Sequence, residues 1–256
     1  PLSPLLRGYD RVLLDLDGCV WVGDRPTPDA VEAIDALRAG GVGVAFVTNN
    51  AMHLAEEFVQ RLWSMGFRAS LEEVVTAGAA VQHALVDRPQ WRSAYVIGAP
   101  ALHRHVEAAG VRILNGSDLQ TRPDVVVVAA SPSFGFEDLR IATLGVFAGA
   151  AILASDADAH YPTPEGPCPG TGAILVLDRP LQHVDVLDRR VAVPGHERPR
   201  RDRISETCNA AASSRWIVLI STPGYASTHG LSPTVTKIEF TSGRWIGSVV
   251  TLGPST

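Results

Sequence analysis

Cysteine is scarce in this sequence, and long apolar runs are absent. Only three cysteines occur in 256 residues, Cys19, Cys168 and Cys208, and their number and wide spacing fit neither a disulfide framework nor a zinc site. No uninterrupted apolar stretch reaches the roughly eighteen residues that a membrane span needs, and the N-terminal residues lack the charged-then-apolar pattern of a secretory signal. The sequence therefore predicts a cytoplasmic protein without a membrane partner.

Positive charge is also sparse. The formal net charge is −5 at pH 7, Lys237 is the only lysine, and the one basic run is Arg-Pro-Arg-Arg at 198–201. Nucleic-acid-binding proteins usually carry a larger basic patch, so we predict no nucleic-acid partner. With 46% hydrophobic and 19% charged residues, the chain is long enough to bury the cores of two modest globular domains.

A short apolar run near the N-terminus ends in two carboxylates and a glycine. Residues 11–21 read Arg-Val-Leu-Leu-Asp-Leu-Asp-Gly-Cys-Val-Trp, and bulky apolar residues without helical spacing predict a buried, parallel strand. Because strand side chains alternate, Asp15 and Asp17 point to the same side, at the carboxyl end of the strand, where open α/β sheets bind ligands. The alternative is a strand that simply ends in solvated acids.

A second buried strand ends in a hydroxyl and two amides. Residues 42–50 read Val-Gly-Val-Ala-Phe-Val-Thr-Asn-Asn, and the side chains of Thr48, Asn49 and Asn50 can hold phosphoryl oxygens by hydrogen bonds. Simple turn chemistry is the alternative. A helical pattern of about ten residues lies between the two strands, so the segment predicts a β-α-β unit with a parallel strand pair.

Together, Asp-Leu-Asp-Gly-Cys-Val and Val-Thr-Asn-Asn, some thirty residues later, resemble motifs I and II of the haloacid dehalogenase superfamily, in its p-nitrophenylphosphatase-like branch. The resemblance covers roughly residues 9–178. It implies an α/β fold, with a Rossmann-like parallel-sheet core and an inserted α/β cap domain. The loop from Trp21 to Pro26 would form a flap over the active site, and Trp21 would either shield that site or be an ordinary packed tryptophan.

The helix and strand patterns along the chain fit two domains. In the first we predict helices at 54–65 and 79–86 and a strand at 74–76. After a linker at 87–90, a second α/β series follows, with strands at 94–97, 124–130 and 151–154 and helices at 101–109 and 137–148. The predicted core domain is 1–87 and 181–256, and the predicted cap domain is 88–180, with a turn-rich stretch at 161–172 returning the chain to the core.

Past this stretch the chain departs from the family at the third motif. The family needs a lysine there to balance charge on the phosphoryl group, but residues 191–199 read Val-Ala-Val-Pro-Gly-His-Glu-Arg-Pro. His196 or Arg198 would have to substitute, and neither places its charge as a long ammonium does.

The metal-binding motif of the family is missing as well. The predicted strand at 215–220 is followed by Ser-Thr-Pro-Gly instead of Gly-Asp, and no aspartate follows Asp202, which is the candidate stand-in. The alternating pattern at 236–240 and the β-rich run at 245–252, on either side of a Ser-Gly turn, predict an antiparallel hairpin instead of the closing β-α-β of the family. A genuine divergence, a fused segment and an altered reading frame all stay open as explanations.

The resemblance implies Mg²⁺-dependent hydrolysis of a small phosphorylated metabolite. Asp15 would attack phosphorus and form an aspartyl-phosphate, and Asp17 would protonate the leaving oxygen and then deprotonate water. Thr48, Asn49 and Asn50 would hold phosphoryl oxygens. The Asp15 carboxylate and the Asp17 backbone carbonyl would bind Mg²⁺. Without the usual further acids, the metal should bind weakly and activity should be low.

The sequence leaves two alternatives to this function. The first is a catalytically silent domain that binds phosphorylated metabolites or acts through its cap as an interaction module. The second is a serine hydrolase, but the sequence contains no Gly-x-Ser-x-Gly. Whether the chain forms a homodimer is left open.

Overall fold

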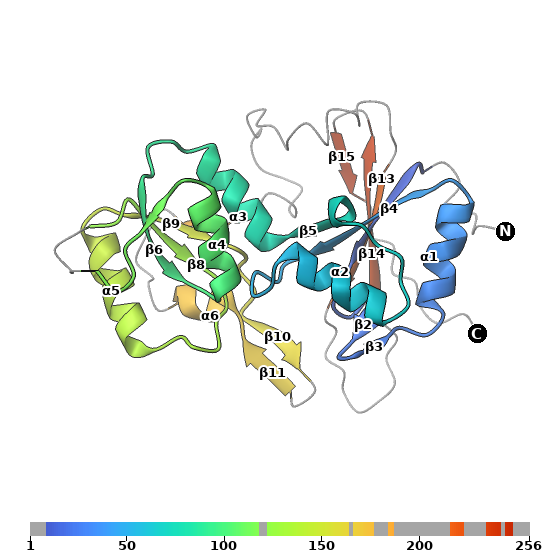
Figure 1. Cartoon of the computed structure of the whole chain (residues 1–256), viewed down its shortest axis with the longest axis horizontal. Helices are drawn as coiled ribbons and strands as arrows, with labels where there is room; N and C mark the ends of the chain where they lie inside the picture. Colours follow the sequence, from blue (N-terminus) through green and yellow to red (C-terminus); the bar gives the residue numbers. More distant parts are fainter. Residues whose placement is uncertain are drawn as a thin grey trace. The chain divides into compact units, whose positions relative to one another are not determined.

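The protein is described by a computed structural model, in which residues 9–117, 122–163, 166–176, 184–186, 216–222, 234–241 and 244–247 are placed. These residues divide into two compact units (Figure 1). The first contains the described residues of 1–47, 59–74 and 194–256, and the second those of 48–58 and 75–193. Among the described residues, no helix combines the length and the apolar character that crossing a membrane requires.

A six-stranded sheet with the order β15-β14-β13-β1-β4-β5 forms the centre of the first unit. Its strands are β1 (Arg11–Asp15), β4 (Gly43–Thr48), β5 (Val74–Thr76), β13 (Trp216–Thr222), β14 (Thr234–Thr241) and β15 (Arg244–Gly247). Strand β1 pairs in parallel with both β4 and β13, whereas β13, β14 and β15 are joined by antiparallel pairings. The predicted parallel pair and the predicted C-terminal hairpin are both confirmed.

Two helices accompany this sheet, α1 (Ala30–Ala39) and α2 (Ala55–Ser64). The strands carry a buried side chain at every second position, so that Val12, Leu14, Val44 and Phe46 all belong to the core. Two short strands, β2 (Trp21–Val22) and β3 (Arg25–Pro26), form an antiparallel hairpin at the predicted flap. A short 3₁₀ helix, η2 (Leu71–Glu73), precedes β5.

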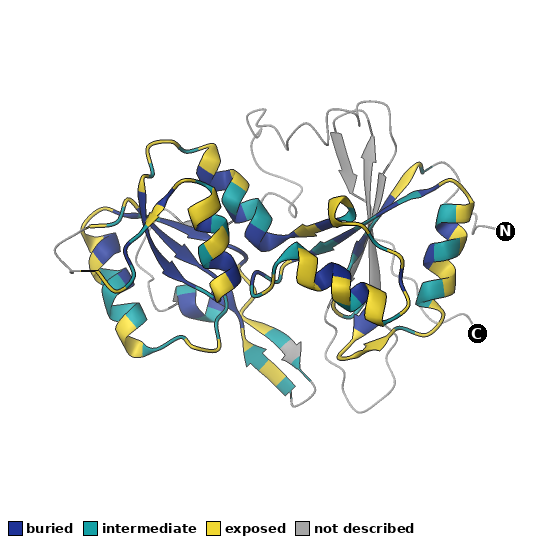
Figure 2. Ribbon diagram, viewed as in Figure 1, coloured by how far each residue is buried: buried dark blue, intermediate teal, exposed yellow. Residues whose placement is uncertain are grey.

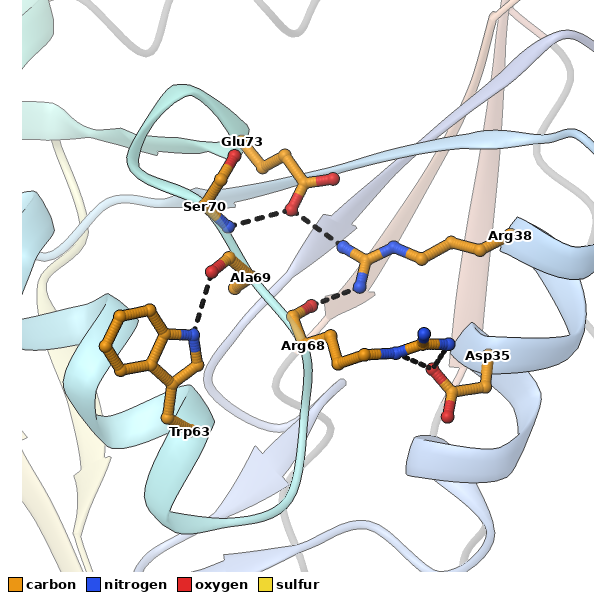
Figure 3. A network of polar contacts seen from close by, with 7 residues as sticks. All are labelled: Asp35, Arg38, Trp63, Arg68, Ala69, Ser70 and Glu73. Carbon is orange, nitrogen blue, oxygen red and sulfur yellow. Dashed lines mark hydrogen bonds and ion pairs between the residues drawn. The ribbon is translucent and has the colours of Figure 1, made fainter.

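The connection from α2 to β5 is held by ion pairs (Figure 3). Arg38 pairs with Glu73 at 2.7 Å and also donates to the backbone carbonyl of Arg68. Arg68 in turn pairs with Asp35 on α1 at 2.7 Å. Each of these surface pairs contributes little by itself. Together they fix residues 65–73 against α1.

The second unit contains a five-stranded parallel sheet with the order β12-β9-β8-β6-β7. Its strands are β6 (Ser93–Ile97), β7 (Arg112–Ile113), β8 (Val125–Val128), β9 (Ala151–Ala154) and β12 (Val184–Val186). Its helices are α3 (Ala77–Val86), α4 (Pro100–Ala108), α5 (Phe136–Phe147) and α6 (Thr171–Val176). All described positions of β6 and β8 are buried (Figure 2). Burial on both faces explains why these strands are continuous apolar runs.

Two hydrophobic clusters cover the two faces of this sheet. Val96 and Val127 pack with α3 and α4, whereas their neighbours Tyr95 and Val126 pack with α5. Helix α3 thus contributes to the second unit, although its residues were included in the predicted core, 1–87. The predicted boundaries at 87/88 and 180/181 stay predictions.

A further hairpin lies in the turn-rich stretch at 161–172, which was expected only to return the chain to the core. Strands β10 (His160–Thr163) and β11 (Gly166–Pro169) pair antiparallel, with Tyr161 opposite Cys168. The sequence did not predict this hairpin, because prolines stand at 162, 167 and 169 and proline is unusual inside a sheet. A two-stranded ribbon consists of edges alone, where a missing N–H is tolerated.

Candidate active site

The candidate site lies at the carboxyl end of β1, in the middle of the six-stranded sheet. Asp15 is the last residue of β1 and stands opposite Val47 of β4, whose own last residue is the buried Thr48. The backbone N–H of Leu16 donates to Asp15 Oδ1 at 2.8 Å and orients this carboxylate. The two strand ends that the sequence singled out are therefore neighbours in one sheet.

The loop after Asp15 folds back on itself. Gly18 has a φ of 82°, and its N–H donates to the carbonyl of Trp21 at 2.7 Å. This turn returns the fully buried Trp21 to Asp17, and the indole Nε1 donates to Asp17 Oδ1 at 2.7 Å. The burial of Trp21 agrees with an ordinary packed tryptophan. The ring also binds the carboxylate that is the candidate acid and base.

Cys19, in the same loop, forms no disulfide with another described cysteine. Burial, followed by the nearby negative charge of Asp15, raises the pKa of Cys19 to about 11. The thiol therefore stays protonated at neutral pH, and a neutral thiol is neither a good metal ligand nor a good nucleophile.

The segment after β4 combines turn chemistry with a long-range contact. The N–H of Asn50 donates to Thr48 Oγ1 at 3.1 Å, and Asn50 Oδ1 accepts from the N–H of Met52 at 2.8 Å, as in an Asx turn. Asn49 is exposed, and its Nδ2 donates to Asp158 Oδ2 at 2.8 Å. The amide oxygen of Asn50 is thus used by the turn, while Asn49 faces the loop after β9.

That loop is organised around Asp156, which was not among the residues predicted from the sequence. The buried Asp156 accepts hydrogen bonds from Ser155 Oγ at 2.7 Å, Thr171 Oγ1 at 2.8 Å and the N–H of Asp158 at 3.0 Å. Burial raises the pKa of Asp156 even though these three hydrogen bonds act in the opposite direction. The signal was present in the sequence, since two acids follow a buried strand here as they do after β1.

Two glycines allow the loop after β9 to approach α6 closely. The N–H of Gly172 donates to the carbonyl of Asp158 at 2.8 Å, and that of Gly170 donates to the carbonyl of Ala159 at 3.0 Å. A Cβ at Gly172 would overlap the carbonyl oxygen of Ala157, and one at Gly170 would overlap that of Asp158. Close backbone packing accounts for this Gly-x-Gly pattern, which lacks the third glycine of a dinucleotide-binding fingerprint.

The described part of the chain offers few side chains that could bind a metal ion. No group of three or more His, Cys, Asp or Glu side chains converges there. The candidate stand-ins His196, Arg198 and Asp202 lie outside the described residues. Asp15 and Asp17 supply carboxylate and carbonyl oxygens, which Mg²⁺ prefers, and Mg²⁺ usually keeps several waters beside one or two protein carboxylates. These residues therefore fit a weakly bound Mg²⁺.

Comparison with known proteins agrees with this arrangement. Residues 12–112 match the family of haloacid dehalogenase-like hydrolases. A D-glycerol 3-phosphate phosphatase of Mycobacterium tuberculosis is 35% identical over 193 residues, covering 75% of this chain and 52% of the relative. The chain thus spans about half the length of this curated relative.

Solved structures give the same result. A glycerol phosphate phosphatase from Mycobacterium tuberculosis, in complex with magnesium, is 34% identical with a TM-score of 0.63, covering 70% of this chain and 53% of that chain. A 4-nitrophenylphosphatase from Thermotoga maritima is 27% identical with a TM-score of 0.63, covering 70% of this chain and 67% of that chain. Residues 12–112, which include both candidate strand ends, are therefore similar to the haloacid dehalogenase-like hydrolases.

Proposed function

We propose that this protein hydrolyses small phosphomonoesters through an aspartyl-phosphate on Asp15. The observation that carries the proposal is the position of Asp15 and Asp17 at the carboxyl end of β1, beside the strand that ends in Thr48. Ligands bind at such ends in open α/β sheets. The family match and the phosphatase names of the relatives support the same chemistry.

The reaction has two steps. In the first, a carboxylate oxygen of Asp15 forms a bond to phosphorus while the ester P–O bond breaks, and Asp17 gives its proton to the leaving oxygen. In the second, Asp17 takes a proton from water as the water oxygen attacks phosphorus, so inorganic phosphate leaves and Asp15 is restored. The hydrogen bond from the N–H of Leu16 keeps the Asp15 carboxylate in one orientation throughout.

The phosphoryl group is held by the end of β4. Thr48 Oγ1 accepts from the N–H of Asn50, so the hydroxyl proton of Thr48 is available to a phosphoryl oxygen. The Nδ2 of Asn49 carries two hydrogens, of which one goes to Asp158 and the other can bind phosphate.

Mg²⁺ completes the proposed site. The Asp15 carboxylate and the Asp17 backbone carbonyl would hold it. When bound, it neutralises the mutual repulsion of the carboxylates and the phosphoryl group. With two protein oxygens and otherwise water, we expect a dissociation constant in the millimolar range, which corresponds to about 4 kcal/mol. The magnesium complex of the related glycerol phosphate phosphatase supports this choice of metal.

The test is steady-state hydrolysis of p-nitrophenyl phosphate and of glycerol 3-phosphate, in 10 mM MgCl₂ (about tenfold above the expected dissociation constant) and in excess chelator. We expect slow turnover that requires Mg²⁺, because a missing electrostatic partner commonly lowers the rate by about 10²- to 10³-fold. Absence of turnover, together with calorimetric binding of inorganic phosphate, would favour the silent metabolite-binding domain. Absence of both would reject the proposal.

A further inference from the structure

The indole of Trp21 has one hydrogen to donate, and the structure gives it to Asp17. Trp21 is completely buried, whereas Asp17 is exposed. A buried indole N–H needs an acceptor, and here the acceptor is Asp17 Oδ1 at 2.7 Å. A buried group that cannot turn away thus holds an exposed carboxylate.

Several contacts keep the Trp21 ring in place. The guanidinium carbon of Arg61, on α2, lies 4.6 Å from the ring centroid, as in a cation–π interaction. Arg61 Nη2 also donates to the carbonyl of Gly23 at 2.6 Å, in the loop that joins β2 to β3. Trp21 itself pairs with Pro26 across this hairpin. The ring is therefore fixed from both its own hairpin and α2.

The hydrogen bond distinguishes the two oxygens of Asp17. An indole nitrogen is a donor only. The indole N–H already occupies Asp17 Oδ1 at 2.7 Å, and the carbonyl oxygen of a carboxyl group accepts a hydrogen bond better than its hydroxyl oxygen does. The transferable proton then belongs on Oδ2.

We propose that Trp21 is a positioning residue for Asp17, which selects Oδ2 as the oxygen that carries the proton to the leaving group. This inference rests on the proposed function and deepens it. The proposed roles of the nucleophile, the phosphate contacts and the metal ligands stay the same. The inference concerns only the transfer of the proton from Asp17 to the leaving oxygen.

The inference predicts a dependence on the leaving group. An alkoxide, such as the one released from glycerol 3-phosphate, leaves only when it is protonated, whereas p-nitrophenolate leaves readily without a proton. Because kcat/KM covers the steps up to loss of the leaving group, a misplaced Asp17 should lower kcat/KM for the first substrate much more than for the second. A purely structural role of Trp21 would lower both equally.

The test is Trp21→Phe, which keeps an aromatic ring and removes the N–H. We expect kcat/KM for glycerol 3-phosphate to fall about tenfold, a part of the 10²- to 10⁴-fold that general acid catalysis supplies, and kcat/KM for p-nitrophenyl phosphate to fall less than about twofold. Trp63→Phe is the matched control. It removes another indole donor of the same unit, whose partner is the backbone carbonyl of Ala69, and it should change neither value (Figure 3).

A double-mutant cycle of Trp21→Phe and Asp17→Asn tests whether Trp21 acts through Asp17. If Trp21 acts through Asp17, adding Trp21→Phe to Asp17→Asn causes no further loss with glycerol 3-phosphate. An equal loss on both substrates, or an additive loss in the double variant, overturns the inference while leaving the proposed function intact. Failure of the unmodified protein to hydrolyse either substrate rejects the proposed function instead.

A second measurement covers the case in which Trp21→Phe does not fold. In ¹⁵N-indole-labelled protein, which has five tryptophans, Asp17→Ala should shift one Nε1–H resonance, and Trp63→Phe identifies the resonance of Trp63. A shift of a resonance other than that of Trp63 supports the contact. The inference fails if no indole resonance responds to Asp17→Ala.

Discussion

Two strands of this protein end in the same pattern, an acid, one residue and a second acid, and the two pairs have different surroundings. Asp15 is the last residue of β1 and is half-buried, and Asp17 follows the strand and is exposed. Asp156 and Asp158 follow β9, where the first is buried among hydroxyl and amide donors and the second is exposed. The Asp-x-Asp pattern thus marks the carboxyl end of a strand, whereas the hydrogen-bond donors around each carboxylate decide whether that carboxylate is available to react.

The largest expected effect is on phosphatase activity, which should depend on the Asp15/Asp17 pair. Asp15→Asn should abolish phosphatase turnover, with a loss above about 10³-fold, because the amide keeps the shape of the side chain and removes the nucleophile. Circular dichroism and the melting temperature should stay those of the unmodified protein. Wild-type turnover in this variant would remove Asp15 from its proposed role.

The next largest effect is on the free energy of unfolding, which should depend on Asp156 of the Asp156/Asp158 pair. Asp156→Ala leaves the hydroxyls of Ser155 and Thr171 and the N–H of Asp158 without their acceptor, and it should lower the free energy of unfolding by about 2–4 kcal/mol. Chemical denaturation measures this. Asp158→Ala, at an exposed position, is the matched control and should cost less than about 1 kcal/mol. Similar costs for the two variants would contradict the structural role of Asp156.

The pH dependence of stability follows from the direction of the Asp156 shift. Burial raises the pKa of Asp156 above its ordinary 3.8, so the folded protein binds this proton more tightly than the unfolded chain does. Asp156 therefore contributes stability that is fully present below pH 3.8 and is lost as the pH rises through the raised value. The melting temperature of the unmodified protein, taken relative to that of Asp156→Asn, should fall as the pH rises above 3.8. A difference that rises with pH would show the opposite sign.

A smaller effect concerns the missing acid at the first strand end. Strand β13 runs parallel to β1, with Leu219 opposite Leu14, so Ser221 lies at the carboxyl end beside Asp15. Ser221→Asp should tighten Mg²⁺ binding about tenfold from the millimolar range, by adding an oxygen ligand. Isothermal titration decides this, with Ser221→Asn as the uncharged control. Micromolar affinity in the unmodified protein would instead indicate a further ligand.

The smallest effect tests the contact that joins the loops after β4 and β9. Asp158→Ala removes the acceptor of Asn49 Nδ2 and should raise KM for p-nitrophenyl phosphate about three- to tenfold with little change in kcat, because one exposed hydrogen bond to a charge is lost. Asp158→Asn keeps an acceptor oxygen and should restore most of the affinity. An unchanged KM in Asp158→Ala would show that the contact does not position Asn49.

Features set by neighbouring residues could be predicted from the sequence. The apolar run at 12–14 predicted β1, the alternation at 236–240 predicted one strand of the C-terminal hairpin, and the Asp-x-Asp and Thr-Asn-Asn ends pointed to the family. Helix and strand periods are local, because side chains repeat every 3.6 or 2 residues whatever the rest of the chain does. For the same reason the hairpin β10–β11 was missed, since its prolines carry no strand pattern.

The sequence by itself determined which residues are candidates for catalysis and at which strand ends they stand, because both follow from residue type and short spacing. Only the tertiary structure decided what each of these residues contacts. Asn49 meets Asp158, 109 residues later, and the Trp21 indole returns to Asp17 because the Gly18 turn and burial of the ring bring it there. Burial also decided the state of Asp156, because removing this carboxylate from water raises its pKa. No short pattern of residues encodes how deeply a side chain is buried.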